Sequence, residues 1–117
     1  MRVAVYSFIS PDVDLDEFLP EDPERFSFLL QALVGPAGVE SGESVEFVVC
    51  TPRWLEERVT SERVIFGRAL VIVGSPDVRQ ILAGIKAAIE RVEAPTWQIL
   101  ARKISRLGVY EFEEVED

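Results

Sequence analysis

The residues of this chain that could bind a metal or react chemically are mainly carboxylates. Asp12, Asp14 and Asp16 reproduce the D-x-D-x-D opening of a calcium-binding loop. Such a loop needs glycine at its sixth position and glutamate at its twelfth, because a sharp turn must bring a bidentate carboxylate onto the ion. Here Glu17 and Pro23 occupy those positions. The pattern therefore predicts a solvated acidic loop, and we expect no metal and no cofactor.

The groups that most often carry catalysis are missing from the sequence. It contains no histidine, which excludes Ser-His-Asp and Cys-His catalysis and histidine-ligated zinc. Cys50, the single cysteine, ends a segment with strand alternation and is interpreted as a buried thiol. Glu111, Glu113 and Glu114 lack the apolar surroundings that raise the pKa of a catalytic carboxyl. We therefore expect a protein that is not an enzyme.

The negative charge of the chain is concentrated in two places. The formal net charge is -9, with seven acids and no base between residues 10 and 24 and five acids after residue 110. This balance argues against nucleic acid and anionic lipid as partners, because both are held mainly by Lys and Arg. The acids either keep a small domain soluble or form a docking surface for a basic protein. Composition alone does not decide between these two readings.

Length and hydropathy favour one domain over residues 1–117. The longest apolar run, residues 69–73, is far shorter than the roughly 20 residues of a membrane-spanning helix. Ser7, Ser10 and Pro11 interrupt any secretory signal near the N-terminus. Together with the lone cysteine, these features predict a cytoplasmic protein that has no contact with a membrane.

The elements that must position these side chains follow from apolar periodicity. Strands are predicted near residues 3–9, 25–34, 44–50 and 68–73, the last with both faces buried because its apolar run is unbroken. Residues 12–24 are predicted as a polar connection carrying a short turn of helix around residues 15–19. Residues 109–115 are predicted as an edge strand or an ordered tail.

Three helix starts are predicted from capping residues. Thr51 precedes a proline, as does Ser75, and Thr96 precedes a stripe of apolar residues that begins with Trp97. The second of these helices is expected over residues 76–92, where apolar residues recur at helical spacing. The fold class is therefore α+β, an antiparallel or mixed sheet of about four to five strands with two helices packed on one face.

The aromatic residues divide between core and surface. Trp97 lies on the apolar stripe of its helix and is expected in the core. For Trp54 the pattern leaves core and partly exposed positions open, because only one turn of its helix can be phased. Tyr110 is the aromatic residue that we expect at an interface, since tyrosine combines apolar area with a polar tip.

Several segments together resemble one protein family. C-T-P-R-W-L-E-E at residues 50–57, W-Q-I-L-A-R-K-I-S-R-L-G at residues 97–108 and Y-E-F-E-E at residues 110–114 look like the immunity protein 8 family of bacterial polymorphic toxin systems. Residues 20–38 and 65–73 are similar as well. The resemblance implies a protein that protects cells by binding a cognate protein toxin encoded beside it. Many such toxins are nucleases, whose surfaces must be basic to hold phosphate.

The chain departs from the family pattern at two places. Arg68 stands where a histidine often follows the glycine, and the ending Y-E-F-E-E-V replaces an aromatic-rich one. If these positions touch the toxin, this member either recognises a different toxin variant or uses the surface differently. A generic binding or scaffold subunit with the same layout is the alternative. The expected partner-binding residues are Asp12, Asp14, Asp16, Glu17, Trp54, Tyr110, Glu111, Glu113, Glu114, Glu116 and Asp117.

Overall fold

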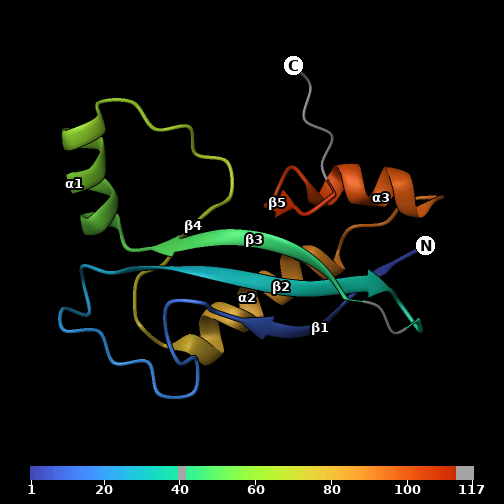
Figure 1. Ribbon diagram of the computed structural model, residues 1–117, viewed down its shortest axis with the longest axis horizontal. Coiled ribbons are helices and arrows are strands. Elements are labelled where there is room, and N and C mark those ends of the chain that lie inside the picture. The colour runs from blue at the N-terminus through green and yellow to red at the C-terminus, as the bar shows by residue number, and fades with distance from the viewer. Residues whose placement is uncertain (40–41, 113–117) are drawn as a thin grey trace.

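A computed structural model describes residues 1–39 and 42–112 of the chain (Figure 1). In these residues five strands form one sheet, accompanied by three helices. The strands are β1 Val3–Ile9, β2 Ser27–Pro36, β3 Glu43–Cys50, β4 Leu70–Ile72 and β5 Val109–Tyr110. The helices are α1 Pro52–Glu62, α2 Val78–Glu90 and α3 Trp97–Ile104. The α+β prediction is confirmed.

The sheet is mixed, with β2 inside it. β1, β2 and β3 follow one another as antiparallel neighbours. The other side of β3 is shared: β4 runs parallel to its end at Cys50, and β5 runs antiparallel to Val45 and Glu46. A register shift lies in β1 between Val5 and Ser7. The sheet is therefore continuous along β2 and β3 and short at the edge formed by β4 and β5.

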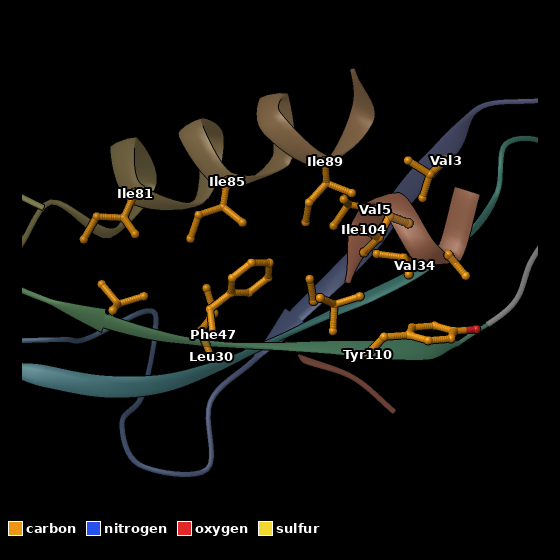
Figure 2. Close-up of a cluster of buried hydrophobic side chains, with 14 of the residues drawn as sticks. Val3, Val5, Leu30, Val34, Phe47, Ile81, Ile85, Ile89, Ile104 and Tyr110 are labelled. Atoms are coloured by element: carbon orange, nitrogen blue, oxygen red, sulfur yellow. The ribbon is translucent and has the colours of Figure 1, made fainter. Parts of the chain in front are cut away.

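The core lies between the sheet and two helices. Alternate residues of β2, from Phe28 to Val34, are buried on one face, and Val45, Phe47 and Val49 of β3 lie on the same face. Ile81, Ile85 and Ile89 of α2 point toward them, as does Ile104 of α3 (Figure 2). This layer contains the predicted two helices on one face.

Side-chain caps fix where the helices begin. Thr51 accepts a hydrogen bond from the backbone N–H of Trp54, and Thr96 accepts one from Ile99, as predicted. The predicted start of the middle helix at Pro76 was two residues too early. Asp77 has extended backbone angles and caps α2 by accepting from Gln80, so the helix begins at Val78.

The α1 helix stands apart from this layer. It has no buried residue, and it lies beyond the end of β3 in Figure 1. The connection that follows it leaves Val64 and Phe66 72% and 90% exposed. Residues 52–66 therefore form a projecting part of the molecule.

Two expectations about local structure were wrong. β4 is not buried on both faces: it is a three-residue edge strand, and its Ile72 is 56% exposed. An unbroken apolar run can lie at a sheet edge when only one of its faces meets a helix. Residues 15–19 contain no helical turn; Asp14 and Asp22 instead accept hydrogen bonds from the backbone two residues ahead, which favours turns.

Candidate partner-binding surface

One face of the sheet has no helix packed on it among the described residues. It carries the side chains that alternate with the core residues of β2 and β3. The cross-strand pairs Leu29 with Val48 and Leu33 with Ser44 lie on this face, and Leu70 lies beside Val48. In Figure 1 the strands stand in front of α2, so this face is turned toward the viewer. We call it the open sheet face.

The open sheet face is apolar and in contact with solvent. Its leucines and Val48 are half-buried, and Ile9, Ile72 and Val109 around them are 48%, 56% and 45% exposed. Monomeric proteins rarely expose contiguous apolar patches larger than a few hundred Å² unless the patch has a binding role. The arrangement can therefore supply the desolvated centre of a protein–protein contact.

A carboxylate occupies the middle of this face. Glu46 lies opposite Gln31, whose side-chain amide donates to the Glu46 carboxylate over 3.3 Å. No ion pair of Glu46 is present among the described residues. Its negative charge therefore stands in an apolar setting, where an opposite charge interacts more strongly than it would in water.

The first predicted acidic cluster lies at the end of the face where β1 stops. Asp12 accepts a hydrogen bond from the backbone N–H of Leu29 at 2.7 Å, and Ser10 donates to the Leu29 carbonyl at 2.6 Å. These two side chains continue the pairing of β2 beyond β1. Asp14 accepts from the backbone of Asp16 at 2.9 Å. Asp16 and Glu17 are exposed on the same connection. Asp12 and Asp14 therefore stabilise the conformation of the loop and also give it negative charge.

The second predicted cluster begins at the opposite end. Glu111 accepts a hydrogen bond from the backbone N–H of Ser44 at 2.7 Å. Ser44 pairs with Leu33, four residues along β2 from Leu29, which corresponds to about 13 Å of strand. The structure thus does not bring Asp12 and Glu111 together; they flank the open sheet face. Glu113, Glu114, Glu116 and Asp117 lie outside the described residues.

Tyr110 lies on the core side of the sheet. It pairs with Val45, is 8% exposed, and its hydroxyl donates to Glu43. Burial and the Glu43 carboxylate raise the pKa of Tyr110 to about 12. The exposed aromatic ring is that of Phe112, 65% accessible and edge-on to Tyr110 at 5.8 Å. Tyr110 was expected at an interface because no local signal shows that β5 pairs with β3, and this pairing turns its side chain inward.

Trp54 lies on α1, which carries none of the predicted acidic partner-binding residues. It is half-buried, and the Arg58 guanidinium lies over its ring at 5.4 Å. Ion pairs of Arg25 with Glu57 and of Arg53 with Glu24 join this helix to the acidic connection. Phe66 and Leu19 are 90% and 91% exposed and were not among the predicted site residues, because an isolated apolar residue in a loop has no periodicity.

The described residues offer little for metal or thiol chemistry. Within residues 1–39 and 42–112, no group of three His, Cys, Asp or Glu side chains is arranged to hold a metal ion. Cys50 is fully buried, as predicted, and burial raises the pKa of its thiol, which disfavours the reactive thiolate. No helix in the same ranges combines the length and apolar character needed to span a membrane.

Comparison with known proteins identifies the family. No curated protein and no solved structure shows significant similarity to this chain. A family model described as immunity protein 8 matches residues 4–115, a span that includes both flanks of the open sheet face. The chain therefore belongs to the immunity protein 8 family.

Proposed function

We propose that this protein binds a cognate toxin domain of a polymorphic toxin system and neutralises it by covering a basic surface, without catalysing any reaction. Membership of the immunity protein 8 family is the observation that carries the proposal. The binding surface is the open sheet face together with its acidic flanks. The protein acts in the cytoplasm of the cell that it protects.

Charge supports a basic toxin as the partner. The chain carries -9 overall, and Glu46 lies within the apolar face while Asp12 and Glu111 lie at its two ends. A nuclease toxin must present positive charge to hold phosphate, and acids at the rim of a contact speed its encounter with such a surface. Asp14, Asp16, Glu17 and the acids after residue 112 extend the same field.

Apolar side chains supply the contact that charge alone cannot. Rim charges tune association and specificity, whereas desolvated apolar and aromatic groups carry most of the affinity. Leu33 and Val48 fill this role at the centre of the face, with Val109 beside them on β5.

Co-expression tests the proposal directly. Cells that produce the toxin domain encoded beside this protein should survive when the chain is supplied, and the two proteins should purify together. An active-site variant of the toxin provides the control for expression. If the chain neither binds the toxin nor spares the cells, the proposal is wrong.

A further inference from the structure

A second surface of the protein carries the opposite charge. A cleft of about 710 Å³ lies beside α3 and β5, and three arginines line it: Arg68, Arg102 and Arg106. All three are exposed, and none of the described lining residues is acidic. In a chain of net charge -9 this is a local concentration of positive charge. We call it the α3 cleft.

The positions of the arginines are set by the end of α3. Arg68 donates from Nε to the Ser105 carbonyl at 3.0 Å and from Nη2 to the Gly108 carbonyl at 3.4 Å. This anchors its guanidinium beside the carbonyl end of the helix, where positive charge is favoured. Arg102 lies in the last turn of α3, and Arg106 lies in the turn that follows the helix. The cleft is therefore lined by positive charge from two separate segments of the chain.

Aromatic rings form the apolar part of the cleft. Trp97 donates from its indole nitrogen to Glu43 at 2.9 Å, and the Tyr110 hydroxyl donates to the same carboxylate oxygen. Because Glu43 holds both polar tips, the two rings are fixed in place. Phe112, which packs edge-on against Tyr110, extends this apolar surface to solvent.

We propose that the α3 cleft binds an acidic segment of a second polypeptide, with carboxylates on Arg102 and Arg106 and an apolar side chain against Trp97 and Phe112. Guanidinium groups match carboxylates with two parallel hydrogen bonds. Two arginines four residues apart suit two carboxylates on one extended chain better than a single phosphate. This site is independent of the open sheet face, and it goes beyond toxin binding through acidic residues.

A nucleotide or nucleic acid fits this surface less well. Pockets for small molecules bury 70–90% of their ligand, whereas the arginines here stand exposed along an open cleft. A longer polyanion is opposed by the net charge of -9, since nucleic-acid affinity depends on neutralising many phosphates. A short peptide with spaced acids can lie along an open cleft, and it carries far fewer negative charges than a nucleic acid.

Fluorescence of Trp97 can report binding once the other tryptophan is replaced. In a Trp54→Phe background, the full-length protein is titrated with a capped short peptide in which glutamates alternate with leucines. The same peptide with glutamines, and adenosine monophosphate, serve as comparison ligands. We expect a saturable change with the glutamate peptide and affinity at least about tenfold lower for both comparisons.

Charge reversal locates the site. The double variant R102E/R106E should weaken binding of the glutamate peptide at least about tenfold. The matched control R79E/K86E makes the same change in net charge on exposed positions of α2 and should bind like the parent. The proposal would be overturned if the glutamate peptide caused no saturable change in fluorescence, or if both double variants lost affinity for it equally. Adenosine monophosphate binding as tightly as the peptide would also overturn it.

Discussion

Glu46 and Gln31 face each other across β2 and β3, joined by a hydrogen bond of 3.3 Å from the glutamine amide to the carboxylate. A neutral amide satisfies one acceptor of Glu46 without cancelling its charge. Apolar side chains from both strands surround this pair, with Leu29 and Val48 on one side and Leu33 on the other. The open sheet face therefore combines an apolar area with one unneutralised charge, which suits a basic partner.

Association with the toxin should depend strongly on salt. Because acids at the ends of the face act over a distance, raising the ionic strength from about 0.02 M to 0.5 M should slow association at least about tenfold. The dissociation rate, governed by the apolar centre, should change much less. Stopped-flow measurements at several salt concentrations provide both rates. An association rate that does not change with salt concentration would show that charge does not steer the protein to the toxin.

Gly108 should not tolerate a side chain. A Cβ atom there would lie 2.7 Å from side-chain atoms of Phe47 and Val45 and 2.8 Å from the backbone oxygen of Glu46. We expect Gly108→Ala to lower the free energy of unfolding by about 1–3 kcal/mol or more, since the backbone of β3 must move. Denaturant unfolding measures this change.

Gly84 provides the control for that substitution. It lies within α2, and nothing is within 4 Å of the position of its Cβ. Gly84→Ala should raise the free energy of unfolding by up to about 1 kcal/mol, because alanine favours the helix. Equal effects of the two substitutions would show that the close packing of β3 under residue 108 is not as described.

The side-chain oxygen of Thr51 should be required for full stability of the fold. The buried hydroxyl accepts hydrogen bonds from the backbone of Phe26 at 3.2 Å and of Trp54 at 3.4 Å, so one atom joins the residue before β2 to the start of α1. Thr51→Val keeps the shape but leaves both donors unsatisfied, and should cost roughly 2–3 kcal/mol of stability. Thr51→Ser keeps the oxygen and should cost less than half as much. Calorimetric unfolding of the two variants distinguishes these outcomes.

Tyr110 should make the protein less stable in strong base. Its pKa is about 12 in the folded state, against 10.0 for an unperturbed tyrosine. As the pH rises, the unfolded chain loses this proton first. The contribution of Tyr110 is therefore complete below pH 10 and falls between pH 10 and 12, by roughly 3 kcal/mol at most.

The variant Tyr110→Phe isolates this effect. It cannot ionise, so the stability difference between parent and variant should be constant below pH 10 and should shift in favour of the variant above it. Urea unfolding across this pH range measures the difference. If the free energies of unfolding of the two proteins changed equally with pH, burial beside Glu43 would not raise the pKa of Tyr110.

Local signals in the sequence predicted most of the elements, because each depends on neighbouring residues. The alternation of Phe28, Leu30 and Ala32 predicted a strand, and Thr51 and Thr96 predicted two helix starts. Where local signals competed, the boundaries shifted: Asp77 displaced Ser75 as the cap of α2 because its side chain reaches Gln80. Periodicity and capping are properties of short segments, and here they were sufficient.

The surface could not be predicted in the same way, because it depends on pairing between distant segments. Nothing local indicates that β5 pairs with β3, and this pairing turns Tyr110 inward and Val109 outward. Nothing local indicates that Asp12 and Glu111 are tied to opposite ends of β2 and β3. The open sheet face itself follows from the helices α2 and α3 lying on the same side, which only the tertiary structure establishes.

The most direct test of the account compares two charge reversals with the same change in net charge. Glu46 lies at the centre of the open sheet face, and Glu56 is exposed on α1. Calorimetric titration of the purified toxin domain into each variant gives its dissociation constant. The account predicts that Glu46→Lys weakens binding at least about a hundredfold, whereas Glu56→Lys changes it by less than about threefold. Equal dissociation constants for the two variants would contradict toxin binding through the open sheet face.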